Sequence, residues 1–210
     1  MRKLLRVPTG GPDGNERLTS AIGLVLVVLL AVEAATTLDL HDYLDVHLFL
    51  GLVLLPVIGL KLASTGWRFV RYYTRNPAYR LKGPPHLFLR ALAPLLVAST
   101  AVLFGTGVTF LVVGHGGGLL LTVHAVTFVI WGVLVAIHTL AYLRLVATHG
   151  VSDWRPSAAS LGGAALRRYA LAAAVAAGVV VGLATYSVQT GWLAHRHHHE
   201  HGFRAFGDRS

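Results

Sequence analysis

Two histidines, His124 and His138, lie fourteen residues apart in one long apolar segment, with Trp131 midway between them. If this segment is helical, fourteen positions of about 100° each return to within roughly 40° of the starting face. The two imidazoles are then about 21 Å apart along the axis. Polar side chains are costly in hydrocarbon and are usually functional there. Two stacked b-type haems, each taking one axial nitrogen from this helix, would explain the spacing.

Each haem needs a second axial nitrogen at the same depth on another helix. His47 lies near the outer end of an earlier apolar segment and is expected to face His124. His86 opens the next segment after a pair of prolines and is the candidate partner of His138. A symmetrical two-haem bundle would carry a histidine fourteen residues after His47, but that position is Lys61, a poor neutral ligand at its ordinary pKa. The sequence leaves open whether the protein binds one haem or two.

Other residues could support such a site. Gly51 lies one turn after His47, where a missing side chain would let a porphyrin approach, although ordinary helix packing explains it equally well. Trp131 could fill the space between two macrocycles or be a core aromatic. Glu33 is a candidate proton acceptor beside a quinol, a partner of an outer histidine, or a solvated interfacial carboxylate. Three arginines could pair with haem propionates or simply follow the positive-inside rule, namely Arg68, Arg71 and Arg90.

Histidines outside the apolar segments are weaker candidates for haem or metal ligands. The end of the chain is a histidine-rich tail whose imidazoles could bind a divalent metal or simply be solvated: His197, His198, His199 and His201. His115, in a glycine-rich turn, is a substitute outer ligand. His41 and His149 lie in connections and are given no role.

Composition indicates the elements that must position these residues. Of 210 residues 54% are apolar and 13% charged, the balance of a membrane protein. Spanning a bilayer takes about 20 residues. Five segments are long enough: 18–38, 44–64, 86–113, 119–145 and 169–189. Because backbone polar groups in lipid must be satisfied internally, the sequence predicts an all-α integral membrane bundle of five transmembrane helices. The expected organisation is an N-terminal segment 1–17, a transmembrane domain 18–191 and a tail 192–210, with a basic, aromatic loop at 66–85.

Charge distribution predicts the topology. From the start of the chain, the successive connections carry four, none, seven, none, four and three Lys or Arg residues, which places fifteen on one side and three on the other. By the positive-inside rule the N-terminus is cytoplasmic and the C-terminus external, in a bacterial plasma membrane. The net charge of +9 is explained in this way, and no nucleic-acid partner is expected. The fifth segment is rich in small residues, which predicts a helix that packs closely on a neighbour or on a partner.

Several kinds of chemistry are excluded. The chain has no cysteine, so thiolate zinc sites, iron–sulfur clusters and covalently attached haem c are ruled out. It also lacks a glycine-rich nucleotide fingerprint, a nucleophile triad and a zinc-protease motif, so no self-contained catalytic site is predicted.

The stretch VHAVTFVIWGVLVAIHTL at 123–140 resembles the haem-bearing helices of bacterial membrane cytochromes b, a broad group that includes cytochrome b561-type and ferric-reductase-like membrane subunits. The stretch HLFLG at 47–51 is similar to their first ligand helix. The connection KLASTGWRFVRYYT at 61–74 resembles that of actinobacterial membrane proteins with the same layout. The resemblance covers residues 47–145.

This resemblance implies electron transfer through bis-histidine haem b, usually between a quinone pool and a partner protein, as a membrane subunit or partner of an oxidoreductase. Two other functions stay open. In one, the histidines are structural and the protein is a non-redox membrane scaffold. In the other, the histidine-rich tail captures divalent metals for a metal-handling membrane protein. The oligomeric state cannot be predicted from the residues.

Overall fold

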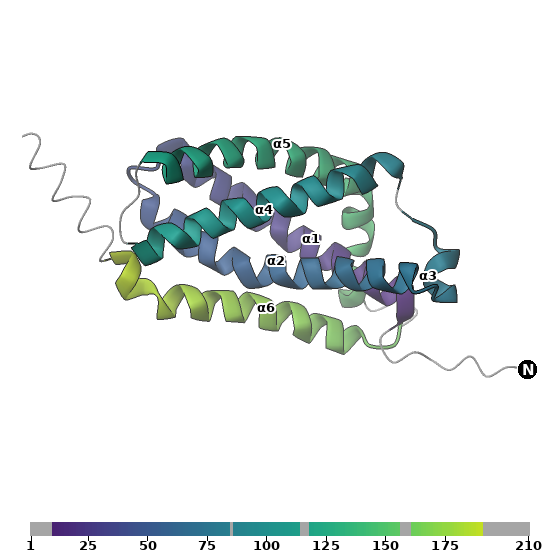
Figure 1. The fold of residues 1–210 in the computed structure, drawn as a ribbon. Helices are drawn as coiled ribbons and strands as arrows, with labels where there is room; N and C mark the ends of the chain where they lie inside the picture. The colour runs from purple at the N-terminus through teal and green to yellow at the C-terminus, as the bar shows by residue number, and fades with distance from the viewer. Residues whose placement is uncertain (1–9, 85, 114–117, 156–160, 191–210) are drawn as a thin grey trace, which may run out of the picture.

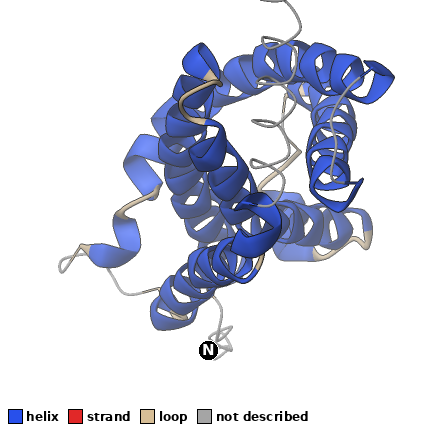
Figure 2. Cartoon of the chain, turned by 90° about the vertical axis from the view of Figure 1, so that its left-hand side faces the viewer, coloured by secondary structure: helices blue, strands red, loops and turns tan. Residues whose placement is uncertain are grey.

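In the computed structural model, the described residues are 10–84, 86–113, 118–155 and 161–190. They form a helical bundle without a strand (Figures 1 and 2). As predicted, five helices are long and apolar enough to cross a membrane: α1 (Gly11–Thr36), α2 (Leu44–Tyr73), α4 (Leu87–Val113), α5 (Gly118–His149) and α6 (Ala164–Ala184). Three short elements connect them, namely η1 (Thr37–Asp39), α3 (Pro77–Leu81) and η2 (Ser152–Trp154).

The long helices alternate in direction along the bundle (Figure 1). α1, α4 and α6 run one way, and α2 and α5 run the other way, so α2 and α5 are parallel to each other. Every Lys and Arg of the described residues lies toward the end where α1 begins, here called the basic end. Asp39, Asp42 and Asp45 lie at the opposite end, here called the acidic end. The connections are therefore sorted by charge between the two ends of the bundle.

The prediction of a loop over 66–85 is wrong in its first half, because α2 continues to Tyr73. Hydropathy marks only the part of a helix that lipid can cover, and a helix can continue beyond it. One glycine inside a helix, here Gly66, costs only about 1 kcal/mol and does not end it. α2 ends where Arg75 adopts a φ of 60° and Pro77 starts α3. α1 likewise begins seven residues before the predicted span, with a proline in its first turn.

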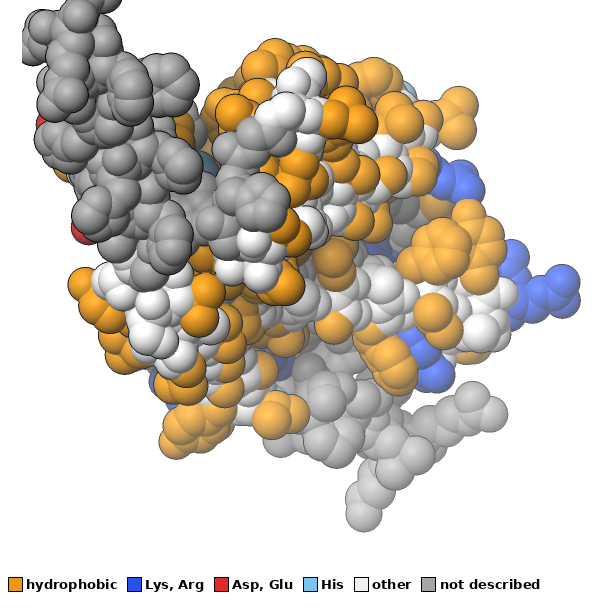
Figure 3. All heavy atoms as spheres, turned by 60° about the vertical axis from the view of Figure 1, so that its left-hand side comes forward, with side chains coloured by type: hydrophobic (Ala, Val, Ile, Leu, Met, Phe, Trp, Pro, Cys, Tyr) orange, Lys and Arg blue, Asp and Glu red, His pale blue; other side chains and the backbone are white. Residues whose placement is uncertain are grey.

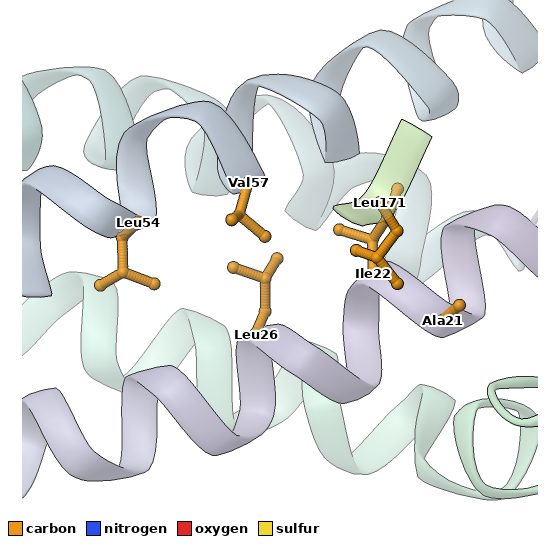
Figure 4. Close-up of a cluster of buried hydrophobic side chains, with 6 residues drawn as sticks. All are labelled: Ala21, Ile22, Leu26, Leu54, Val57 and Leu171. Atoms are coloured by element: carbon orange, nitrogen blue, oxygen red, sulfur yellow. The ribbon is translucent and has the colours of Figure 1, made fainter. Parts of the chain in front are cut away.

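α1, α2 and α6 share the buried core, whose apolar side chains meet in Figure 4: Ala21, Ile22, Leu26, Leu54, Val57 and Leu171. α6 approaches α2 through two glycines one turn apart. A Cβ atom at Gly178 would overlap the backbone carbonyl of Val53, and one at Gly182 would lie 2.6 Å from the Phe49 ring. Small residues let helix backbones come together in lipid. The predicted packing role of the fifth span is confirmed.

α4 and α5 form a hairpin that packs on α1 through α5 and touches α2 only narrowly. Trp131 is buried in this hairpin and donates from Nε1 to Thr100 Oγ1 at 2.9 Å. The opposite faces of the two helices expose large apolar side chains, including Val102, Val129 and Val133. Apolar side chains also cover much of the lateral face in Figure 3. This is the surface that a bilayer would cover.

Ion pairs join the connections at the basic end. Asp153 in η2 is paired with Arg167 of α6 at 2.6 Å and with Arg17 of α1 at 3.3 Å. Lys82, after α3, pairs with Asp13 and Glu16 of α1 at 2.7 and 2.5 Å. Partial burial by itself would lower the pKa of Lys82, but the two carboxylates outweigh it and hold that pKa above its ordinary value.

Gly178→Ala is expected to destabilise the bundle, because the added methyl group would push α6 away from α2. Overpacking of this kind costs about 1–3 kcal/mol. The measurement is the free energy of unfolding in mixed micelles of SDS and a mild detergent. Gly59→Ala is the control, since a Cβ atom there meets nothing within 4 Å. Equal stability of the two variants would contradict the close α2–α6 approach.

Candidate functional site

His47, in the first turn of α2, is held by two side chains of α1. Its Nδ1 lies 3.1 Å from Thr36 Oγ1 and 3.1 Å from Glu33 Oε1. The Thr36 hydroxyl donates its only proton to the Glu33 carbonyl at 2.6 Å, so its oxygen can only accept from the ring. A neutral His47 ring that donates from Nδ1 to this oxygen would carry its lone pair on Nε2.

His124, on α5, is held in the same way by α4. Its Nδ1 lies 2.8 Å from Thr106 Oγ1. The Thr106 hydroxyl lies 2.8 and 2.9 Å from the carbonyls of Val102 and Leu103, to which it can donate its one proton while accepting from the imidazole. The backbone of Leu103 also forms a hydrogen bond with His124. Phe110 packs edge-on against the ring, with centroids 5.5 Å apart.

The two imidazoles lie at corresponding depths on parallel helices. His47 and His124 are close enough for their charges to interact. Fourteen residues further along each helix, Lys61 and His138 interact in the same manner. α2 and α5 are not among the helix pairs that pack extensively. The pairing of His47 with His124 stays a prediction, and Lys61 is the residue of α2 that interacts electrostatically with His138.

Two glycines and one unpaired carboxylate oxygen lie near the two histidines. A Cβ atom at Gly51 would lie 3.6 Å from Glu33 Oε1, and one at Gly107 would lie 3.5 Å from the His124 ring, both ordinary contact distances. The atoms present therefore do not require glycine at either position. Glu33 Oε2 is buried and has no hydrogen-bond partner in the described part of the chain. Buried polar atoms are rarely left unpaired, so the site fits an additional group beside Glu33.

His86 and His138 are not brought together. In the antiparallel α4–α5 hairpin, Trp131 contacts Thr100 and His124 contacts Thr106. Continuing this register by seven residues along α5 places His138 at the level of about residue 93 of α4. His86 immediately precedes α4 and is exposed, about 10 Å away along the axis. The ring of His138 instead packs against Tyr142, with centroids 4.9 Å apart.

The three arginines proposed for propionates all lie at the basic end, far from His47. Arg68 is twenty-one residues along α2 from His47, about 31 Å for a helix. It interacts electrostatically with Tyr142 of α5. Arg71 lies over the Trp67 ring at 5.4 Å, and Arg90 donates to the Tyr73 hydroxyl at 2.7 Å. These arginines could meet propionates only of an inner haem. His115 and the tail histidines lie outside the described residues.

Sequence reasoning missed Thr36 and Thr106, whose hydroxyl groups lie 3.1 and 2.8 Å from Nδ1 of His47 and His124. Threonine is common in membrane helices, and its hydroxyl usually bonds to the carbonyl three or four residues earlier. Only the register and rotation of the neighbouring helices show that each of these two hydroxyls also faces a histidine. Trp131, by contrast, is buried as its position between the histidines suggested.

The donor set does not suit a bare metal ion, because no group of three or more His, Cys, Asp or Glu side chains in the described residues could hold one. Comparison with protein-family models, curated proteins and solved structures finds no match for this chain. The likeness to membrane cytochromes b therefore stays a prediction.

Thr106→Val is expected to release the tautomer of His124, because valine cannot accept from Nδ1–H. The fraction of His124 protonated at Nε2 should rise, and the ¹⁵N chemical shifts of the histidine ring in labelled protein report it directly. Thr109→Val is the matched control, since Thr109 bonds only to the Gly105 carbonyl in the same helix. An unchanged His124 spectrum in Thr106→Val would show that Thr106 does not orient the ring.

Proposed function

We propose that this protein is a membrane cytochrome b in which His47 and His124 are the axial ligands of one haem b. The observation that supports this most strongly is the matched setting of the two rings, since Nδ1 of each lies within hydrogen-bond distance of a threonine hydroxyl on a neighbouring helix. A ring that donates from Nδ1 to that hydroxyl would offer its Nε2 lone pair to iron. Ligand histidines usually donate their other ring nitrogen to a carboxylate or carbonyl group, which fixes the ring and raises its basicity.

A porphyrin accounts for the small number of protein ligands. It supplies four nitrogens itself, so two imidazoles complete an octahedral iron, whereas a bare metal ion would need more side chains than this region offers. When bound, haem b supplies a one-electron couple, and the protein supplies ligation, burial and electrostatics. Glu33 would place a carboxylate beside the His47 ligand, and Gly51 and Gly107 would leave room for the macrocycle.

The same geometry favours one haem over two. His138 has no histidine partner at its depth in the described residues, because the corresponding position on α2 is occupied by Lys61. Lys61 Nζ donates to the Thr19 carbonyl at 2.7 Å. An ammonium group engaged in this way has no free lone pair for iron.

The distribution of Lys and Arg residues predicts how the bundle is oriented in the membrane. We infer that the basic end faces the cytoplasm of a bacterial cell, which places the haem in the outer half of the membrane. The electron partner is then a quinone or a redox protein that reaches this half. The described residues contain no separate catalytic site, so the chain is proposed as an electron carrier within a larger redox system.

The decisive measurement is a dithionite-reduced minus oxidised optical spectrum of the purified protein, with haem quantified as its pyridine complex. The expected result is a haem b signal near one per chain. His47→Ala and His124→Ala should each abolish or strongly reduce it, because each removes an axial nitrogen. His138→Ala and His86→Ala should retain it, as should His41→Ala, whose ring bonds to Asp42 outside the bundle.

Other results would redirect the assignment. A signal near two per chain, lost in part by His138→Ala, would restore the second haem. A flat spectrum after expression with adequate haem would overturn the cytochrome and leave the scaffold and metal-handling functions.

A further inference from the structure

Two cations of α2, Lys61 and Arg68, have no carboxylate partner among the described residues. The Lys61 ammonium group lies near Val146 of α5, since both are 3.2 Å from a Cβ atom placed on Gly23. Lys61 and Arg68 are seven residues apart and therefore lie on one face of the helix. Lys61 interacts electrostatically with His138, and Arg68 interacts with Tyr142, one turn further along α5. His138 and Tyr142 are themselves in ring contact. Four side chains from two helices that do not pack extensively thus form one cluster of hydrogen-bond donors.

No acid in the described residues is available to neutralise this cluster. Asp13 and Glu16 are bonded to Lys82, and Asp153 is bonded to Arg17 and Arg167. Lys61 Nζ donates one of its three N–H groups to the Thr19 carbonyl. Gly23 leaves room for this ammonium group, because a Cβ atom on Gly23 would lie 3.2 Å from Lys61 Nζ. Arg68 has no hydrogen bond within the described residues. The cluster therefore retains excess positive charge and unused donors.

The position of the cluster matches the level of lipid headgroups. Lys61 precedes and Arg68 follows residue 64, where the apolar segment of α2 is predicted to end. Trp67, Phe69 and Tyr73 are exposed on the same helical turns, and aromatic side chains of this kind prefer the membrane–water interface. Figure 3 shows Lys and Arg side chains gathered beside apolar ones at one edge of the molecule. Lys61 counts with the basic residues of this end of the bundle, but it lies inside the predicted span 44–64 and not beyond it.

A third cation lies at the rim of this cluster. The Nε atom of Arg71 is buried and has no hydrogen-bond partner in the described residues. Its guanidinium group lies over the Trp67 ring at 5.4 Å. A buried guanidinium donor without an acceptor is rare unless a ligand supplies one.

We propose that the basic end of the bundle binds the phosphate group of an anionic phospholipid between α2 and α5, with Lys61 and Arg68 as its cationic contacts and His138 and Tyr142 as further donors. Basic sites between transmembrane helices on the cytoplasmic side are suited to such headgroups. This site is separate from His47 and His124 and does not depend on haem.

The test is lipid retention by the full-length protein, measured by native mass spectrometry with added phosphatidylglycerol or with phosphatidylcholine of the same acyl chains. The wild type should retain phosphatidylglycerol preferentially. Removing one charge near a lipid surface should weaken retention about fivefold, and removing two about thirtyfold. Arg68→Gln tests the first case, and Lys61→Gln with Arg68→Gln tests the second.

Two controls make the outcome decisive. Arg80→Gln removes the same charge from the exposed surface of α3, outside the cluster, and should keep wild-type retention. Arg68→Gln removes no hydrogen bond to the described residues, so the test stands even if Lys61→Gln fails to fold. No preference for phosphatidylglycerol in the wild type, or an equal loss in Arg80→Gln, would overturn the proposal. If an equal concentration of glycerol 3-phosphate displaces the lipid, the site binds the free phosphate ester, and the proposal of a phospholipid ligand is wrong.

Discussion

A bilayer offers a buried imidazole no water, and two histidines of the bundle have a hydrogen-bond partner on a neighbouring helix instead. His47 finds Thr36 and Glu33 on α1, and His124 finds Thr106 on α4. In both cases the threonine proton is already committed to a backbone carbonyl, which leaves the threonine oxygen able only to accept. Backbone satisfaction in the helices thus leaves each threonine oxygen as an acceptor for Nδ1–H, and a ring that donates there would carry its lone pair on Nε2.

The bundle consists of a closely packed part and a more loosely packed part. α6 lies so close to α2 that glycines are needed at the contact, and α1 completes a shared apolar core. α4 and α5 pack mainly on each other, and α5 packs on α1. His47 belongs to the tight part and His124 to the hairpin. A group bound between the two rings would therefore join two parts of the bundle that otherwise have limited contact, and its loss would loosen the hairpin first.

Hydropathy and charge alone predicted the five spans and their alternating directions, because both properties are dictated by lipid. The pairing of His47 with His124 was predicted from helix geometry and two matching depths, and it stays a prediction. The extension of α2 to Tyr73 was missed, because residues beyond the bilayer are free to be polar and still helical. Thr36 and Thr106 were missed because their roles depend on how adjacent helices are rotated. The partner of His138 was predicted as His86, whereas the geometry places Lys61 there, although the sequence had marked Lys61 as the position that breaks the symmetry.

On α2 and on α5, two polar residues lie fourteen positions apart: His47 and Lys61 on α2, and His124 and His138 on α5. The bundle therefore has two levels with different chemistry. At the acidic end, both positions are histidines with neutral, orientable rings. At the basic end, one is a lysine whose ammonium group cannot act as a neutral ligand while it donates to Thr19. A haem at the first level would therefore lie about 21 Å along α2 from the second, where excess positive charge favours an anion instead. One cofactor at the acidic end cannot by itself carry electrons to the basic end. In the proposed cytochrome, the exchange partner would have to approach from the acidic half or through the lipid, as a membrane-soluble carrier or an external redox protein can.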